Sequence, residues 1–306
     1  MKKQWKPKIA SLDERRRLRG IQHDSEKIGT IGFHHVEFYC GDAKNTASRF
    51  ALALGMRIVG ETGQQTGNAE CISYGLESGD FRLLLTAPYS REAASAMEAA
   101  APSNNDSIGK APQPLPSFGI DDAHVFFGKH GLAGRAIGIE VKDATKAFEA
   151  AVAGGAEPLL EPTFVPTCNG QLQEDPSDVD GCYMSEVKLY GDVALRFVEF
   201  TATAQSTDDA TTTMTKPRAF LPHLSPVTGR MAERDTYGIQ RIDHAVGNVP
   251  DLQEILEKVM GFTGFHEFAE FTAEDVGTVD SGLNSVVLAS DSEAVLLPLN
   301  EPTEGK

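Results

Sequence analysis

Three stretches of the chain place apolar residues at the i, i+3, i+4, i+7 spacing of an amphipathic helix. They span residues 42–54, 143–153 and 251–260, and each begins at an aspartate. The aspartate carboxylate can accept hydrogen bonds from the first-turn N–H groups. Each stretch ends at a glycine, a residue that tolerates the left-handed turn after a helix: Gly55, Gly154 and Gly261. The repeated signals predict three copies of one unit.

Apolar runs on both sides of these helices predict strands. One run precedes each helix, and the last run of each copy follows an acidic turn. The first strands are expected at 35–40, 137–141 and 244–249, and the last strands at 81–86, 193–200 and 294–299. Each copy therefore reads β-α-β-β-β, which predicts an α+β fold of tandem βαβββ modules.

One helix covers only one face of a four-stranded sheet, so two modules can enclose a cavity between their open faces. We expect modules one and two to form such a pair, and module three to need a fourth module as its partner. The residues at the strand starts, His35, Ala136 and His244, would line these cavities. Alanine cannot bind a metal, so the first cavity is expected to be inert. The pattern predicts a satisfied His35 beside an exposed His34.

The domain organisation follows from these units. Residues 1–29 are expected to form a basic tail, because the first twenty residues hold eight Lys or Arg against two acids. A solvated tail is favoured over a transit peptide, which should be Ser-rich and free of acids. Residues 30–203 would form the first domain, 204–236 a linker, and 237–306 the first module of a second domain. A second linker or long loop is expected at 91–117, which is rich in Ala, Ser, Asn and Pro.

The charge balance is strongly acidic, with 28 basic and 44 acidic residues and a net charge of −16. This argues against nucleic acid or an anionic membrane as a partner, because both need a positive surface. The four cysteines, Cys40, Cys71, Cys168 and Cys182, form no CxxC pair. They indicate reduced thiols and a cytoplasmic protein. His244 stays open at this point, because a lone histidine on an apolar strand is more often structural than a metal ligand.

Longer segments carry a resemblance to a known family. They are Phe33-His-His-Val-Glu-Phe-Tyr-Cys-Gly-Asp42, Lys188-Leu-Tyr-Gly-Asp192, Arg241-Ile-Asp-His-Ala-Val-Gly-Asn-Val-Pro250, Ser281-Gly-Leu-Asn-Ser285 and Leu296-Leu-Pro-Leu-Asn-Glu-Pro302. In this order the chain resembles the plant and algal 4-hydroxyphenylpyruvate dioxygenases from about residue 30 to 302. That family belongs to the vicinal-oxygen-chelate superfamily, whose βαβββ modules agree with the repeat.

The resemblance implies an Fe(II) cofactor, held by two histidines and one glutamate in the second module pair. His244 matches the first histidine. The other two ligands come from the fourth module and have no counterpart in this sequence. Ser285 and Asn300 match positions that line the substrate pocket, and Val246 is expected to face the same cavity. The implied substrates are an α-keto acid and O2, and the reaction converts 4-hydroxyphenylpyruvate to homogentisate and CO2 in tyrosine catabolism.

Two alternatives remain open. One is a related oxygenase that forms 4-hydroxymandelate from the same substrate, and the other is a protein that binds a small ligand or partner without iron. We expect the 306-residue chain, interpreted as C-terminally truncated, to have little or no turnover by itself. The resemblance also implies a homodimer for the full-length protein.

Overall fold

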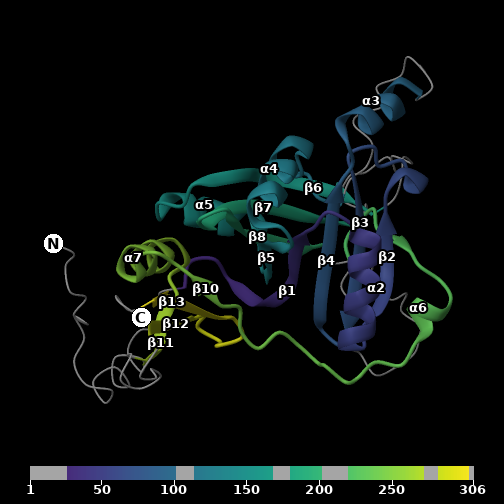
Figure 1. The fold of residues 1–306 in the computed structure, drawn as a ribbon. Helices are drawn as coiled ribbons and strands as arrows, with labels where there is room; N and C mark the ends of the chain where they lie inside the picture. Colours follow the sequence, from purple (N-terminus) through teal and green to yellow (C-terminus); the bar gives the residue numbers. More distant parts are fainter. Residues whose placement is uncertain (1–25, 101–113, 168–179, 202–219, 272–281, 303–306) are drawn as a thin grey trace.

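The computed structural model describes residues 26–100, 114–167, 180–201, 220–271 and 282–302 (Figure 1). Within these ranges the chain forms two sheets, of nine and four strands. No helix among the described residues is long and apolar enough to cross a membrane.

The nine-stranded sheet contains the first two modules. Module one comprises β1 (Thr30–Tyr39), α2 (Ala43–Leu54), β2 (Arg57–Thr62), β3 (Cys71–Ser78) and β4 (Phe81–Pro88). Module two comprises β5 (Ala133–Val141), α5 (Ala144–Ala153), β6 (Pro158–Pro166), β7 (Gly181–Tyr190) and β8 (Val193–Phe200). Each first strand pairs in parallel with the last strand of its own module, and β1 pairs antiparallel with β5. The expected pairing of the two modules is therefore present as one continuous sheet.

Module three repeats the same order in the smaller sheet. It comprises β10 (Gly247–Asn248), α7 (Leu252–Thr263), β11 (His266–Phe271), β12 (Leu283–Ala289) and β13 (Leu296–Pro302). The strand order β10-β13-β12-β11 is that of β1-β4-β3-β2 and of β5-β8-β7-β6. The predicted α+β fold of tandem βαβββ modules is confirmed.

The three repeated helices begin where the sequence predicts. Asp42, Asp143 and Asp251 cap them, each accepting a hydrogen bond from a backbone N–H at 2.8–3.0 Å. Their ends differ more. Gly55 adopts the predicted left-handed conformation, with φ 63°, but in α5 the left-handed residue is Gly155 rather than Gly154.

The prediction that the third helix ends at Gly261 is wrong, because α7 continues to Thr263 and is capped by Gly264. Gly261 instead lies against the end of α5. A Cβ atom on Gly154 would come within 2.6 Å of the Gly261 carbonyl oxygen. The two glycines therefore serve the close approach of two helices, and this contact joins module three to module two (Figure 1).

The first strand of module three is much shorter than the predicted 244–249. Only Gly247 and Asn248 are strand residues, although the Ala245 N–H still donates to Leu296 and the Val249 N–H to Asn300. β1 is paired on both edges, by β4 and β5, whereas the described residues pair β10 only with β13. A strand that is stabilised on one edge has fewer backbone hydrogen bonds to hold it extended.

Several segments expected to be tails or linkers are structured. Within 91–117, α3 covers Arg91–Ala100, and a further helix, α4 (Ile120–His130), follows this segment. In the expected linker 204–236, Phe220, Leu221 and Leu224 pack in the core, while β9 (Ser225–Pro226) extends the sheet beside β2 and α6 (Arg230–Glu233) follows. Residues 101–113 and 202–219 lie outside the described residues. The composition of these segments predicts loops, but their apolar side chains are buried against the core, and this burial orders them.

The expected basic tail is also partly packed. Residues 1–25 lie outside the described residues, but Ile28 is 2% exposed and belongs to the core shared by modules two and three. The Lys27 N–H donates to Thr263, and Glu26 accepts from the N–H of Asp291 at 2.9 Å. This short segment therefore connects β1 to the end of α7 and to the turn between β12 and β13.

Candidate functional site

The two faces of the third sheet differ in character. Val286, Leu288, Leu297 and Leu299 are buried in the core that includes α7. Side chains alternate along a strand, so the residues between them lie on the face that α7 does not cover. Ser285 and Asn300, both predicted to line a substrate pocket, are therefore on the helix-free face.

Strand register brings these two residues beside a third polar side chain. Ser285 lies opposite Asn300 across β12 and β13, and Asn300 lies opposite Asn248 across β13 and β10. Asn300 Nδ2 donates to Asn248 Oδ1 at 3.3 Å, while Ser285 is 7% exposed. We call Ser285, Asn300 and Asn248 the polar row. Asn248 was missed by the sequence analysis, although its spacing of four from His244 was a usable signal.

His244 lies just before β10, with a side chain that is 49% exposed. Its Nδ1 lies 2.9 Å from Asp243 Oδ2, and Asp243 is 3.1 Å from Arg241 Nη2. The hydrogen bond with His244, more than the nearby Arg241 cation, lowers the pKa of Asp243. An ionised carboxylate only accepts hydrogen bonds, so Nδ1 of His244 is the donor of this hydrogen bond and Nε2 is the ring nitrogen not engaged by Asp243.

A groove of about 810 Å³ separates this segment from the first two modules. His244, Val246 and Asn248 line one side of it, and Val246 is 50% exposed. The other side is mainly apolar and aromatic, and it includes Phe38 and Phe50. Ser285 and Asn300 do not line this groove. The structure thus brings His244 and Val246 together in the groove, and Asn248 links them to the other predicted pocket residues.

The described residues do not complete an iron site. Among them there is no group of three His, Cys, Asp or Glu side chains that could hold a metal ion. A 2-His-1-carboxylate site needs three such ligands on one face of the iron. Of the predicted ligands the described residues include His244, and by themselves they do not fit the cofactor.

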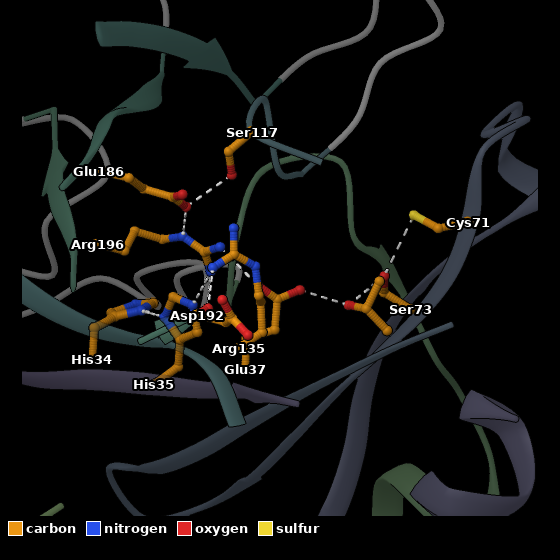
Figure 2. Close-up of polar contacts among 11 residues, drawn as sticks. His34, His35, Glu37, Cys71, Ser73, Ser117, Arg135, Glu186, Asp192 and Arg196 are labelled. Carbon is orange, nitrogen blue, oxygen red and sulfur yellow. Dashed lines mark hydrogen bonds and ion pairs between the residues drawn. The ribbon is translucent and has the colours of Figure 1, made fainter. Parts of the chain in front are cut away.

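The inner face of the first module pair carries a buried cluster of charged side chains. Arg196 lies between two carboxylates there, with Nη2 2.7 Å from Glu37 and Nε 2.6 Å from Glu186 (Figure 2). Each carboxylate also accepts a hydrogen bond from a hydroxyl group. Thr86 donates to Glu37 and Ser117 donates to Glu186, each at 2.8 Å. Leu115, Phe118, Phe220 and Leu221 pack beside this cluster.

Both histidines of the first strand belong to the same interior. His34 was expected to be exposed, but it is 1% exposed and stacks on Phe220. His35 lies opposite Gly138, not Ala136, and its ring occupies the space where a Cβ atom on Gly138 would lie. Gly138 leaves room for the His35 ring, and a register shift between Phe33 and His35 marks an irregularity in β1 at His34.

The hydrogen bonds fix the protonation of these rings. Arg196 Nη1 donates to His35 Nε2 at 2.8 Å, and His35 Nδ1 lies 2.7 Å from His34 Nδ1. Since an arginine cannot accept, His35 must be neutral, with its proton on Nδ1 and donated to His34. Burial, and then the Arg196 cation, hold the pKa of His35 well below its usual value of 6.5.

Charged residues inside apolar strands were the available signal for this cluster. Glu37 and Arg196 interrupt otherwise apolar runs, but a sequence alone does not reveal that they meet across modules. The cysteines fit the expectation of reduced thiols where they are described: Cys40 and Cys71 are free and buried, and Cys182 is buried as well. Burial raises the pKa of Cys71 to about 12, which makes it unreactive. Cys168 lies outside the described residues.

No protein-family model matches the chain. It is 47% identical to the 4-hydroxyphenylpyruvate dioxygenase of Daucus carota over 282 residues, which covers 92% of this chain and 55% of the carrot protein. The Arabidopsis thaliana enzyme of the same name is 47% identical over 281 residues, which covers 92% of this chain and 56% of that protein. The chain thus spans about half the length of these curated relatives. A mutant of 4-hydroxymandelate synthase from Streptomyces coelicolor shares the fold, with a TM-score of 0.60 and 16% identity over 90% of this chain and 64% of the other.

Proposed function

We propose that this chain acts as part of an Fe(II)-dependent dioxygenase, because it is a homologue of the plant 4-hydroxyphenylpyruvate dioxygenases. The proposed reaction converts 4-hydroxyphenylpyruvate and O2 to homogentisate and CO2, a step of tyrosine catabolism. The observation that carries the proposal is 47% identity over 92% of the chain. The repeated module order and the position of His244 before the first strand of module three support it.

Within this proposal, His244 is the first iron ligand. The Asp243 carboxylate supports that role, because it accepts a hydrogen bond from Nδ1 and so orients the imidazole with Nε2 on the far side of the ring. Ser285, Asn300 and Val246 are the proposed substrate-binding residues. Neutral polar groups beside apolar side chains suit an aromatic substrate, which needs apolar contact and a few hydrogen bonds for orientation.

Iron would supply the coordination of the keto acid and the reaction with O2. The described residues provide one of its three ligands, and no iron-dependent step follows from them alone. We therefore expect little or no turnover from the 306-residue chain by itself. We also propose a cytoplasmic homodimer, to be checked by cell fractionation and light scattering; buried free thiols support a reducing compartment.

The dioxygenase is favoured over an enzyme that forms 4-hydroxymandelate. Sequence identity is 47% to the carrot dioxygenase but 16% to the mandelate synthase, a level that carries the fold and not the product. A ligand-binding protein without catalysis is the remaining alternative, and product analysis separates all three.

The test replaces the aligned segment of the carrot enzyme with residues 26–302 of this chain. We expect the chimera to consume O2 and to form homogentisate when Fe(II) and 4-hydroxyphenylpyruvate are supplied. The matched control is the same chimera with His244→Ala, which should lose the activity and bound iron while keeping its circular dichroism spectrum. Formation of 4-hydroxymandelate, or a folded chimera with iron and no product, would contradict the proposal.

A further inference from the structure

We propose that a small pocket on module two is a further binding site, and that its ligand is a small carboxylate with an apolar body. The pocket has a volume of about 270 Å³ and is formed by α4, β5, β6, β7 and the turn before β8. All of the described residues that line it lie between Asp122 and Val193, so they include no part of module three. Binding there requires neither iron nor a complete catalytic domain.

Three cationic side chains reach this pocket, although the protein has a net charge of −16. They come from three separate elements: Lys129 from α4, Arg135 from β5 and Lys188 from β7. Two acidic residues, Asp122 and Asp192, also line the pocket. A pocket that gathers more cations than carboxylates on an acidic protein favours an anion as its ligand.

The two lysines are already engaged by exposed carboxylates. Lys129 Nζ lies 2.6 Å from Asp192 Oδ2, and Lys188 Nζ lies 3.1 Å from Glu157 Oε2. Hydrogen bonds from Lys129 and His130 lower the pKa of Asp192 to about 2, so this carboxylate is ionised at neutral pH and keeps Lys129 in place. The lysines therefore add to the positive field of the pocket, while the direct contact with an anion falls to the third cation.

Arg135 differs from the lysines because its partner is neutral. Its Nη1 donates to the backbone carbonyl oxygen of Asp192 at 2.7 Å (Figure 2), and no ion pair among the described residues involves it. The guanidinium carbon lies 5.9 Å from the ring centroids of both Tyr39 and Phe126. These contacts hold the side chain in place but use one of its five N–H donors. The remaining planar fork suits a carboxylate, which it can bind through two parallel hydrogen bonds.

An apolar wall of the pocket indicates what the rest of the ligand is. Val125 is 70% exposed and Leu159 is 40% exposed, and both line the pocket beside the buried ring of Phe126. Large aliphatic side chains that face water next to cations favour a ligand whose charged group is attached to an apolar body. The volume lies just below the roughly 300–1,000 Å³ of most ligand pockets, so this ligand is small.

The order of residues along α4 determines how such a ligand lies. Asp122, Val125 and Lys129 follow one another at spacings of three and four residues, so they share one face of the helix. Asp122 and Lys129 are about 10 Å apart along the helix axis. The carboxylate therefore binds at the end that holds Lys129 and Arg135, away from Asp122, and the apolar body lies over Val125.

The test is an NMR titration of the full chain with phenylacetate, followed through the methyl groups of valine and leucine. Acetate lacks the apolar body and phenylacetamide lacks the charge, and we expect each to bind roughly 10-fold or more weakly than phenylacetate. Phenylacetate should shift the methyl signals of Val125, Leu159 and Val193 more than that of Val246, which lines the groove at His244. Arg135→Gln should weaken phenylacetate binding roughly 10- to 100-fold, the effect of losing hydrogen bonds to a charged group.

The matched control is Arg91→Gln, which removes the same charge from an exposed residue that pairs with Asp121 at the start of α4. It should change the Kd for phenylacetate by less than about twofold, because an exposed charge outside the pocket is screened. Leu159→Ser should weaken phenylacetate roughly 3-fold or more through the lost apolar contact. This variant keeps the test decisive if Arg135→Gln does not fold, because Leu159 is only partly buried.

Three outcomes would overturn the assignment of this pocket: no saturable binding of phenylacetate, methyl shifts confined to Val246, or equal Kd values for Arg135→Gln and Arg91→Gln. Each of them leaves the proposed function standing, because phenylacetate has no keto group and its binding does not depend on iron. Conversely, a chimera that forms no homogentisate would contradict the proposed function and leave this pocket unaffected.

Discussion

Modules one and three share an order of elements, an aspartate cap and a strand order, yet their first strands differ. β1 has 10 residues and is paired on both edges, whereas β10 has 2 residues and is paired on one. The length of the first strand in this unit therefore depends on whether a second strand pairs with its other edge. His244 precedes the short strand, so the position of the proposed ligand also depends on what lies beside β10.

The open faces of the two regions differ in chemistry as well. In the first module pair the face holds a buried cation between two carboxylates, with aromatic side chains packed around it. In module three the corresponding face carries three neutral polar side chains. One sheet architecture therefore supports a buried charge cluster in one place and a proposed recognition surface in the other.

The largest expected effect comes from breaking the buried charge cluster. Arg196→Met would leave Glu37 and Glu186 buried without their cation, and we expect the free energy of unfolding to fall by about 3–5 kcal/mol. Urea unfolding measures this. The matched control in module three is Arg241→Met, whose ion pair with Asp243 is exposed and should contribute much less to stability. Equal losses in the two variants would contradict the contrast between the regions.

One added methyl group at the contact between modules two and three should lower the stability of the protein. In Gly154→Ala the new Cβ would lie 2.6 Å from backbone atoms of Gly261 and Phe262, which cannot move aside as a side chain can. We expect a loss of about 1–3 kcal/mol and faster hydrogen exchange in α5 and α7.

The control for that variant is Gly128→Ala in α4, where the added Cβ meets nothing within 4 Å. Removing a glycine from a helix interior should stabilise the protein by up to about 1 kcal/mol. Unchanged hydrogen exchange of α5 and α7 in Gly154→Ala would contradict the prediction, because it would mean that modules two and three do not depend on this close contact.

Acid should weaken the first module pair through His35. Its pKa is low in the folded protein and near 6.5 when unfolded, so below pH 6.5 the unfolded chain binds a proton that the folded chain does not. The free energy of unfolding should therefore decrease as the pH is lowered below 6.5, by up to about 1.4 kcal/mol per pH unit. We expect His35→Gln to reduce this slope between pH 6.5 and 5 in urea unfolding.

His223 provides the comparison for that measurement. Burial also lowers its pKa, but its side chain is only partly buried, so the same sign and a smaller effect are expected. The His35 interpretation would be wrong if His223→Asn removed more of the pH dependence than His35→Gln.

The smallest effect tests whether the repeated units are equivalent. Asp42→Ala and Asp251→Ala each remove a helix cap and should cost about 1 kcal/mol, while Asp251→Asn should retain most of the stability. Hydrogen exchange should localise the loss to α2 in one variant and to α7 in the other. A loss spread evenly over both modules would show that they unfold as one unit.

Local signals determined much of the fold. The aspartate caps and the 3.6-residue period located all three repeated helices at their starts. Apolar runs after acidic turns located the last strand of each module, although the third was expected at 294–299 and lies at Leu296–Pro302. Those features depend on neighbours within one turn or one strand, so the sequence specifies them directly. The positions of Ser285 and Asn300 on one face follow from the same strand alternation, and the resemblance indicated a role for them.

Only the tertiary structure decided features that join distant segments. Gly261 has the sequence signature of a helix end, but packing against Gly154 gives it a place within α7. His35 is buried where Gly138 leaves space and Arg196 donates to its ring from module two, and His34 is buried against Phe200 and Phe220. The shortness of β10 and the bond from Asn300 to Asn248 likewise depend on which strands lie side by side. A sequence determines propensity residue by residue, whereas burial and hydrogen-bond partners depend on contacts between residues far apart in the chain.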